Sequence, residues 1–426
     1  MKIETKEMSY TEVIALPKRK KFKPKKPSIL FRTLLKVVSD PELKKVGFKC
    51  HKIGMQRLKR EEPCIILMNH SSFIDLKIAA SVLYPRPFNI VCTFDGFVGK
   101  NWLMRNLGCI PTNKFVFDFS LLRSIQHTLK DKKSSVLMYP EACYSFDGTS
   151  TTLGDNLGKF LKMMGVPLVM IKTYGAFTRD PLYNNLQKRN VKVSADMEYV
   201  LSPEEIAQSS AEELQKRVEK LFEFDAFRWQ EENGISIPES FRADGLHRVL
   251  YKCPDCMTEG QMQGLGTAIT CKKCGASHEL TESGTLSPIN GANGFKFVSD
   301  WYRWERECVR KEIEDGGYSL DLDVDIAMLV NTKCLYKVGN GRLRHGEDGF
   351  SLCGCDGKLD YSQKPLATYT LNSDFFWYEM GDVIAIGDND TLYYCFPKGC
   401  GDVVAKARLA TEELFKLKKV RVHANA

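Results

Sequence analysis

The sequence predicts three folded regions. These are an α/β domain with a central mixed sheet flanked by helices, a small cysteine-rich metal-binding module, and a β-rich domain that ends in a helix. Short apolar runs alternate with helical stretches over residues 28–235, which favours the α/β class. Four cysteines with metal-ligand spacing follow within residues 247–281. Residues 296–426 then show the apolar–polar alternation and turn residues that are typical of half-buried strands.

The composition fits a globular protein of two or three domains. Of the 426 residues, 43 % are hydrophobic, enough for a substantial core. No run approaches the roughly 18 consecutive apolar residues that a membrane-spanning helix requires. Residues 1–6 lack the apolar segment of a secretory signal, so we expect a cytoplasmic protein. The 15 cysteines indicate reduced thiols and a metal site rather than a disulfide scaffold.

Positive charge is concentrated at the N-terminus. Residues 1–60 hold 18 Lys and Arg against 5 Asp and Glu, a balance of +13, whereas the whole chain carries +8. The densest run, Lys18–Lys26, precedes an apolar segment at 29–38, and we expect residues 1–27 to form a flexible basic arm. Such an arm suits an anionic membrane surface, where each cation contributes on the order of 1 kcal/mol. Nucleic acid would attract it too, and a solvated arm without a partner is the simplest alternative.

Alternating elements define the first domain, which we place at 28–235. The buried strands that apolar runs predict lie at 64–68, 88–92, 135–139 and 167–171. The predicted helices lie at 118–130 and 155–164, with a charged amphipathic helix or helix pair at 203–233.

The predicted C-terminal domain, 296–426, combines strands with two helices. A helix is expected at 296–313, and a strand at 318–326, where apolar and acidic residues alternate. Turn residues separate further short strands, and a final amphipathic helix is expected at 403–419. Several antiparallel strands capped by one terminal helix resemble a pleckstrin-homology-like barrel.

The segment Asn69–Asp75 holds the strongest candidate for catalysis. His70 follows the predicted strand 64–68, at the C-terminal end where α/β folds place ligands. We expect a helix to start within Ser71–Ser72, since serine caps helices well, and Asp75 then reaches back to the imidazole. Such a pair supplies a general base with an orienting carboxylate. Without further context, a structural histidine at a helix start is the simpler interpretation.

Four ordered segments provide that context. They are Asn69-His70…Asp75, Gly108–Phe115, Tyr139–Ser145 and Gly165–Ile171. In this order they resemble the four sequence blocks of the glycerolipid acyltransferase family related to lysophosphatidic acid acyltransferases, whose first block is H-x-x-x-x-D. The resemblance spans about residues 30–235. Four blocks in the right order rarely arise by chance, so they favour the catalytic interpretation of His70.

The resemblance implies an activity and a set of site residues. His70 would be the general base and Asp75 its orienting partner. The acceptor site would comprise Lys114, Glu141, Tyr144 and Ser145. The implied reaction moves a fatty acyl group from acyl-CoA or acyl-carrier protein to a hydroxyl of a lysophospholipid-like acceptor of the 1-acylglycerol-3-phosphate type, without a catalytic cofactor. Backbone amides and cations would stabilise the oxyanion. The enzyme would work peripherally on the inner face of the membrane.

The third block departs from the family. Its Gly-Thr-Arg is replaced here by Ala142-Cys143-Tyr144, so the usual phosphate-binding arginine is missing. Tyrosine cannot replace a bidentate Arg–phosphate contact. Either a cation such as Lys114 or Lys172 compensates, or the acceptor lacks a phosphomonoester at that place. The following segment, 146–150, is either a loop that shapes the same pocket or an ordinary surface turn.

The second strong motif lies within residues 247–281. Two C-x-x-C pairs bracket fourteen residues, which is the spacing of a zinc ribbon, and Gly275 suits the tight turn after the second pair. The ligands would be Cys253, Cys256, Cys271 and Cys274. A closed four-sulfur site leaves no open position for substrate, so we expect one structural zinc ion. Four further cysteines, at 353, 355, 395 and 400, match no metal spacing and are expected to be buried reduced thiols.

Two alternatives remain open at this point. The altered third block is compatible with a non-catalytic protein on the same fold that binds lipid or acyl carrier, although the intact His70–Asp75 pair opposes this. A nucleic-acid-binding protein is the less favoured hypothesis. The ribbon mixes Lys252, Lys272 and Lys273 with Asp255, Glu259 and Glu279, and therefore has no strongly basic face.

Overall fold

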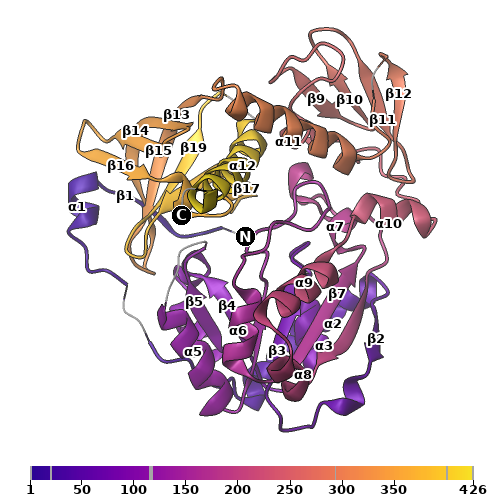
Figure 1. Ribbon diagram of the computed structural model, residues 1–426, viewed down its shortest axis with the longest axis vertical. Helices are drawn as coiled ribbons and strands as arrows, with labels where there is room; N and C mark the ends of the chain where they lie inside the picture. Colours follow the sequence, from indigo (N-terminus) through magenta and orange to yellow (C-terminus); the bar gives the residue numbers. More distant parts are fainter. Residues whose placement is uncertain (1, 20–21, 115–118, 293, 400–401, 425–426) are drawn as a thin grey trace.

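The computed structural model contains three sheets in three regions (Figure 1). It describes residues 2–19, 22–114, 119–292, 294–399 and 402–424, excluding the side chains of the last two. A seven-stranded sheet forms the lower part of the view, an eight-stranded sheet the upper left and a four-stranded sheet the upper right. Within the described residues, no helix has the length and apolar character needed to cross a bilayer.

The first sheet is mixed, as expected. Its strand order is β2-β8-β7-β3-β6-β4-β5, and all neighbours are parallel except the antiparallel pair β7–β8. The strands are β2 Lys49–Ile53, β3 Ile65–Met68, β4 Phe88–Thr93, β5 Cys109–Thr112, β6 Ser135–Met138, β7 Leu168–Tyr174 and β8 Ser194–Leu201. The four predicted strands correspond to β3, β4, β6 and β7, which confirms the α/β class of this region.

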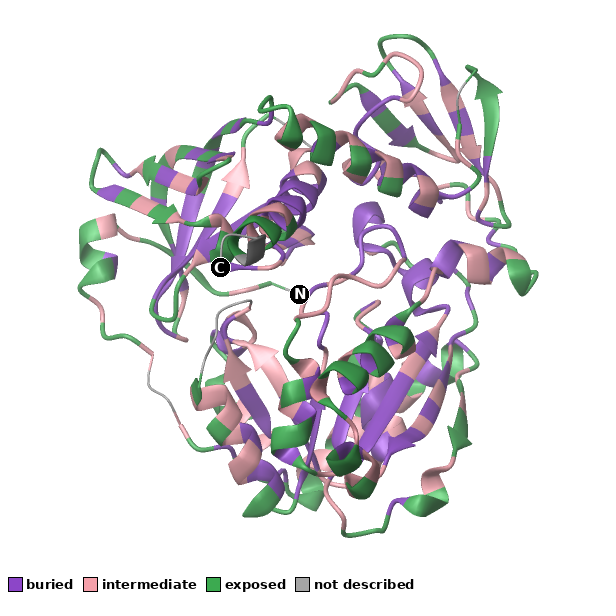
Figure 2. Ribbon diagram, in the orientation of Figure 1, coloured by how far each residue is buried: buried purple, intermediate pink, exposed green. Residues whose placement is uncertain are grey.

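Helices cover both faces of this sheet because successive side chains of its central strand point to opposite faces. In β3, Ile66 and Met68 pack with residues of α2 and α3, whereas Ile65 and Leu67 pack with residues of α5, α6 and α9. Figure 2 shows the resulting continuous burial of the central strands. The helices are α2 Ile29–Lys45, α3 Asp75–Leu83, α4 Asn101–Asn106, α5 Phe119–Lys130, α6 Leu157–Met164, α7 Ala176–Arg179, α8 Pro203–Gln208, α9 Ala211–Phe222 and α10 Ala226–Glu232.

The cysteine-rich module forms a small antiparallel sheet in the order β12-β11-β10-β9. Its strands are β9 Met262–Leu265, β10 Ala268–Cys271, β11 Ser277–Leu280 and β12 Leu286–Asn290. Helix α11, Val298–Glu314, then leads to the third region and packs on the final helix, α12 Val403–Ala424 (Figure 1). Short 3-10 turns occur at Met55–Arg57, Phe94–Phe97, Leu182–Asn184, Leu246–Arg248 and Pro365–Ala367.

The third region is an antiparallel sheet in the order β16-β15-β14-β13-β19-β18-β17. The strands are β13 Leu320–Leu329, β14 Leu335–Gly346, β15 Gly349–Gly354, β16 Leu359–Gln363, β17 Asn372–Trp377, β18 Gly381–Gly387 and β19 Leu392–Pro397. The predicted alternation of apolar and acidic residues is confirmed in β13, where the apolar residues are buried and the acidic ones exposed. Helix α12 packs its apolar residues, among them Leu409 and Leu414, into the same core.

The expectation of a flexible arm over residues 1–27 is wrong for much of its length. Strand β1, Thr5–Glu7, pairs in parallel with β14, and helix α1, Tyr10–Ile14, follows it. Strand β15 pairs only with the second half of β14. The same edge of β14 is therefore open along its first half, where β1 pairs with it. Further along, the backbone N–H of Arg19 donates to Val330 O. Charge density carries no information about such backbone pairing, so the sequence pattern missed it.

Candidate active site

His70 lies at the C-terminal edge of the first sheet, directly after Asn69 and strand β3. The Asn69 side chain ties this strand end to β7: its Oδ1 accepts hydrogen bonds from Thr173 N at 2.8 Å and from Thr173 Oγ1 at 3.1 Å. The second block contains β5 and runs past its end, and the third block directly follows β6. Because parallel strands end at the same edge of a sheet, all three blocks meet there.

His70 and Asp75 form the expected pair, with His70 Nδ1 3.2 Å from Asp75 Oδ2. The same Oδ2 accepts the backbone N–H groups of Ser71 at 2.8 Å and Ser72 at 3.0 Å. The predicted helix start at Ser71–Ser72 is wrong, since α3 begins at Asp75. The Asp75 carboxylate binds the amides of Ser71 and Ser72, which holds it in place against the imidazole, and the Ser72 hydroxyl accepts the Ile74 N–H at 3.3 Å.

The environment keeps His70 neutral. Burial lowers the pKa of His70, Asp75 partly opposes this, and the charge of Lys114 lowers the pKa further. A neutral imidazole that donates through Nδ1 to the carboxylate carries its lone pair on Nε2, so Nε2 can accept a proton. The imidazole side chain is 20 % exposed and that of Asp75 only 1 %, so the base is reachable while its partner is not.

Glu141 braces the loop that carries His70. Its carboxylate accepts the His70 backbone N–H at 2.7 Å and the Thr151 N–H at 2.8 Å. The side chain is buried, and burial raises its pKa to about 7. Both carboxylate oxygens therefore serve to fix protein segments. Thr151 was not singled out from the sequence, because it lies ten residues beyond Glu141 and outside the third block.

Two tyrosines enclose the imidazole of His70. The ring of Tyr139 stacks on it with a centroid separation of 4.3 Å, and that of Tyr144 with 3.9 Å. Phe73 in turn stacks on Tyr144 at 5.2 Å. Tyr144, which replaces the family's arginine, is therefore directly against the candidate base. Sequence reasoning missed Tyr139, although its place in front of Pro140-Glu141 in the third block marked it.

The two lysines predicted as candidates for acceptor binding have different neighbours. Lys114 follows β5, and its charge acts on His70 and on Cys143. Lys172 instead donates to Glu223 O at 2.7 Å and lies over the Phe224 ring. Lys172 therefore makes its hydrogen bond and its ring contact at Glu223 and Phe224, so its role as a compensating cation stays a prediction.

The remaining third-block residues stabilise their own loop. Ser145 is buried; its Oγ donates to Thr149 O at 2.6 Å and accepts the Gly148 N–H at 2.9 Å. Ser145 therefore closes an internal turn, and its contact with the acceptor stays a prediction. Cys143 is buried as well, as expected for a packing residue.

The C-terminal domain holds this loop from the other side. Phe146 stacks on Phe375 of β17 at 4.1 Å, and the guanidinium of Arg408 lies 3.4 Å from the Phe146 ring centroid. Arg408 also donates to Tyr144 O at 3.0 Å and to Ser373 Oγ at 3.0 Å. Segment 146–150 is therefore no surface turn. Phe375 and Arg408, more than 200 residues further along the chain, therefore hold the loop that carries Tyr144, whose ring stacks on His70.

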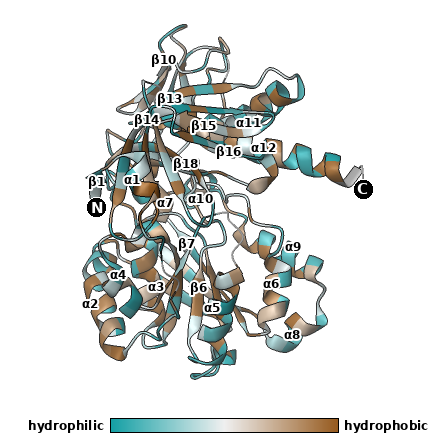
Figure 3. Ribbon diagram, turned by 90° about the vertical axis from the view of Figure 1, so that its left-hand side faces the viewer, coloured by the Kyte–Doolittle hydropathy of each residue, from teal (hydrophilic) through white to brown (hydrophobic). Residues whose placement is uncertain are grey.

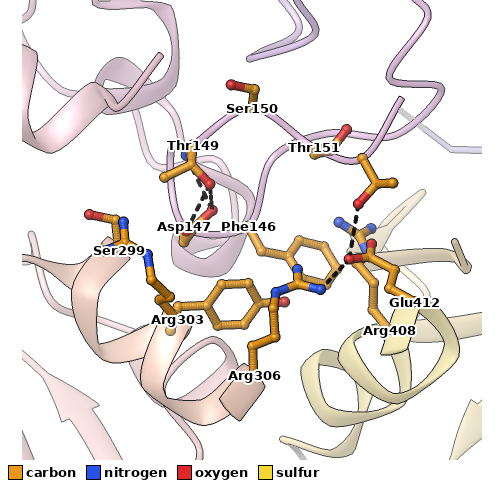
Figure 4. A pocket seen from close by; sticks show the side chains of 12 residues that line it. Phe146, Asp147, Thr149, Ser150, Thr151, Ser299, Arg303, Arg306, Arg408 and Glu412 are labelled. Atoms are coloured by element: carbon orange, nitrogen blue, oxygen red, sulfur yellow. Dashed lines mark hydrogen bonds and ion pairs between the residues drawn. The ribbon is translucent and has the colours of Figure 1, made fainter. Parts of the chain in front are cut away.

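A cavity of about 220 Å³ separates the third-block loop from α11 and α12 (Figure 4). Arg306 of α11 pairs with Glu412 of α12 at 2.7 Å, and Thr152 Oγ1 donates to Glu412 Oε2 at 3.2 Å. Loop, α11 and α12 are thus linked by one polar network across the cavity (Figure 4).

The second block is also in contact with the C-terminal domain. The Asn113 amide donates to Asn389 O at 3.2 Å, in the turn between β18 and β19. On β17, burial raises the pKa of Asp374 to about 6, and the charges of Lys114 and Arg408 oppose that rise. Neither Asp374 nor Arg408 carries any sequence motif, so only the tertiary structure reveals them.

The four predicted metal ligands come together. The Sγ atoms of Cys253, Cys256, Cys271 and Cys274 all lie within 4.8 Å of one another. The Sγ–Sγ separations are 3.6 Å for Cys253–Cys274 and 3.7 Å for Cys256–Cys271. A tetrahedral zinc site with bonds of about 2.3 Å has edges of about 3.8 Å, so the cluster fits the ion.

The other cysteines only partly match the expectation. Cys355 and Cys395 are buried thiols, Cys353 is exposed, and Cys400 lies outside the described residues. Within the described part of the chain, they join no metal-ligand cluster.

Comparison with known proteins bears on the same region. The family model named Acyltransferase matches residues 49–171. Among solved structures, the lysophosphatidic acid (1-acyl-sn-glycerophosphate) acyltransferase PlsC from Thermotoga maritima is similar at 18 % identity and a TM-score of 0.36, covering 45 % of this chain and 76 % of that chain. No curated protein matches significantly.

The matched segment contains the His70–Asp75 pair and every predicted acceptor-site residue. It also contains β3, β5 and β6, at whose C-terminal ends the first three blocks meet. The similarity to the Acyltransferase family model is thus confined to the segment that holds the candidate site.

Proposed function

We propose that this chain is a glycerolipid O-acyltransferase with His70 as its general base. It would transfer a fatty acyl group from acyl-CoA or acyl-carrier protein to the hydroxyl of a lysophospholipid-like acceptor. The observation that supports this most directly is the buried Asp75 carboxylate, which is fixed by two amides and holds His70 Nδ1 within a segment of acyltransferase sequence.

The chemistry needs only a base and a site for the developing charge. His70 Nε2 takes the proton of the acceptor hydroxyl while its oxygen attacks the thioester carbonyl. The tetrahedral intermediate collapses, the C–S bond breaks, and the thiolate leaves with the proton from the imidazolium. Asp75 stabilises the imidazolium, and the two tyrosine rings hold it in plane. The products are an ester and a free thiol.

Activity of a His70→Ala variant tests the proposal. With labelled acyl-CoA or acyl-carrier protein and a panel of lysolipids, we expect His70→Ala to lose about 10²–10⁴ in rate. His127→Ala is a matched control, because it removes another His–Asp pair, His127–Asp131 at 2.5 Å, that lies on the exposed side of α5. Absence of transfer by the wild type, or transfer unaffected by His70→Ala, would refute the proposed function.

We also propose that the enzyme docks peripherally on the anionic cytoplasmic face of a membrane. Helix α2 exposes an apolar stripe formed by Ile29, Leu30, Leu34, Val37 and Val38. Helices α2 and α4 lie side by side (Figure 3). On α4, Trp102 is 71 % exposed, and its ring centroid lies 5.8 Å from that of Phe31 on α2. The exposed Lys23, Lys25 and Lys26 precede this stripe. Exposed aromatic and aliphatic groups beside cations are typical of interfacial binding.

Liposome co-sedimentation tests the docking. We expect Trp102→Ala with Leu30→Ser to reduce binding to anionic vesicles, since the apolar contact is lost. Leu265→Ser is the control, because Leu265 is 69 % exposed but lies in the cysteine-rich module. Equal binding by all variants, or binding that does not respond to salt, would contradict the proposed surface.

For the accessory regions we propose a structural zinc ion and a pleckstrin-homology-like barrel. The four thiolates would hold the ion and lock the module, with no part in the chemistry at His70. A four-stranded meander β13–β16, a three-stranded meander β17–β19 and the terminal helix α12 support the barrel assignment.

A further inference from the structure

The cavity between the third-block loop and helices α11 and α12 is lined mainly by polar side chains (Figure 4). Four residues that share one face of α11 form one wall: Ser299, Tyr302, Arg303 and Arg306. The loop forms another wall, to which Thr149, Ser150, Thr151 and Thr152 contribute hydroxyl groups. The volume of about 220 Å³ is many times the roughly 10–15 Å³ that it takes to hold one water molecule, so a larger group fits.

Two hydroxyl groups at this cavity have a proton to donate. Tyr302 is only 6 % exposed, and within the described part of the chain its hydroxyl forms no hydrogen bond. A buried hydroxyl without a partner costs free energy, so such groups are normally satisfied by protein, water or a ligand. Burial raises the pKa of Tyr302, so the phenol keeps its proton. Ser150 Oγ accepts the Phe224 N–H at 3.1 Å, which leaves its own O–H available.

Two arginines of α11 add further donors. Both ion pairs of Arg306, with Glu412 at 2.7 Å and with Glu413 at 3.0 Å, use Nη1, so its Nε and Nη2 have no partner among the described residues. Arg303 contacts Asp300 through Nη1 alone, at 3.3 Å, and its side chain is 61 % exposed. In Figure 4 both arginine side chains extend from α11 toward the loop.

The carboxylates that line the cavity are already occupied. Both oxygens of Asp147 accept a hydrogen bond from Thr149 Oγ1, each at 2.9 Å. Glu412 accepts from Thr370 Oγ1 at 2.6 Å with one oxygen and pairs with Arg306 through the other. Three arginines line the cavity against these two carboxylates. The cavity therefore has a surplus of donors and of positive charge, and the group that fits it is an anion with several acceptor oxygens.

We infer that this cavity binds a phosphate group between the third-block loop and α11. A phosphate monoester carries about −1.5 to −2 charges at pH 7 and three acceptor oxygens, and guanidinium groups bind it strongly. It accepts from the unpaired phenol and from both arginines of α11. The chemistry is the same for a phosphate of the acyl donor, a phosphate of the lipid acceptor and free phosphate. Because Thr151 of this loop binds Glu141, which accepts the His70 N–H, an occupied cavity also steadies the loop that carries His70.

Inorganic phosphate is the probe, added to the full chain in place of chloride at constant ionic strength. We expect the unfolding temperature of the wild type to rise with phosphate concentration, and calorimetry to show saturable binding of about one phosphate per chain. Tyr302→Phe should weaken this binding about tenfold or more. It should not lower stability without phosphate, because it removes only an unpaired hydroxyl. Arg303→Met should weaken binding by about the same factor, since a charged donor is lost.

Each variant has a matched control. Tyr251→Phe controls for the phenol, because the Tyr251 hydroxyl is also buried without a partner among the described residues but does not line this cavity. Arg310→Met controls for the charge, since Arg310 is one turn further along α11 and pairs with Glu314. Both controls should bind phosphate like the wild type. No saturable binding by the wild type, or equally tight binding by Tyr302→Phe and Arg303→Met, overturns the inference and leaves a cavity that holds water.

Steady-state kinetics identifies the molecule that supplies the phosphate. KM is compared between the wild type and Arg303→Met for acyl-CoA, acyl-dephospho-CoA, lysophosphatidic acid and monoacylglycerol. A KM that rises about tenfold for acyl-CoA and not for acyl-dephospho-CoA assigns the site to the 3′-phosphate of the donor. A rise for lysophosphatidic acid and not for monoacylglycerol assigns it to the acceptor. Unchanged KM values, with phosphate binding lost, assign it to free phosphate. Because binding is measured without substrate, a lack of acyl transfer refutes the proposed function and leaves the phosphate site intact.

Discussion

The four-cysteine centre and the His70 centre are assembled over very different lengths of chain. The cysteines lie within 22 residues, in two tight turns of one small module. In the His70 centre, Asp75 lies five residues further along the chain, and Glu141 follows the neighbouring strand β6. Arg408, which binds Tyr144 O, comes from the C-terminal domain. Local spacing is therefore sufficient for the first centre. The second depends on how two domains pack.

The largest effect is expected at the cysteine centre. Cys253→Ser should abolish stoichiometric zinc binding, because a structural zinc ion contributes on the order of 10 kcal/mol to folding of its module. Metal analysis should give about one zinc per chain for the wild type and for Cys353→Ser, whose exposed thiol lies outside the cluster. Full zinc content in Cys253→Ser would show that the four thiols do not act as one site.

A smaller effect, confined to the active site, is expected from Arg408→Met. This change removes the donors to Tyr144 O and Ser373 and leaves buried acceptors unpaired, at a cost of about 1–3 kcal/mol. Acyl transfer should fall about tenfold or more because the Tyr144 wall loosens, while zinc content stays unchanged. Arg421→Met, at the exposed end of α12, is the control. Loss of stability with unchanged kcat/KM would show that Arg408 does not position the third block.

The smallest effect concerns pH. His70 must be neutral to act as a base, and burial lowers the pKa of His70 from 6.5. Activity should therefore persist below pH 6.5 and fall only as the pH drops through this lowered pKa. Asp75 acts to raise the pKa of His70, so Asp75→Asn should move the acid limb of kcat/KM further down as well as slow the reaction. An acid limb above pH 6.5 would show that burial does not dominate.

Much of the first domain was predictable from the sequence. Apolar runs identified β3, β4, β6 and β7 because buried parallel strands are apolar on both faces. The ordered blocks identified His70, Asp75 and Glu141 because these follow strand ends. The predictions for the start of α3 and for residues 5–14 were wrong. Amide binding by Asp75 and pairing of β1 with β14 leave no local pattern in the sequence.

By itself, the sequence determined the α/β class, the His70–Asp75 pair and the cluster of four cysteines. Each of these depends on spacing within a strand, a loop or a knuckle, where covalent geometry limits the outcome. Only the tertiary structure decided that Tyr144 stacks on His70 and that Arg408 binds the backbone of Tyr144. The Arg408–Tyr144 contact joins residues 264 positions apart, and it depends on which surfaces of two domains fit together. No local periodicity encodes that fit.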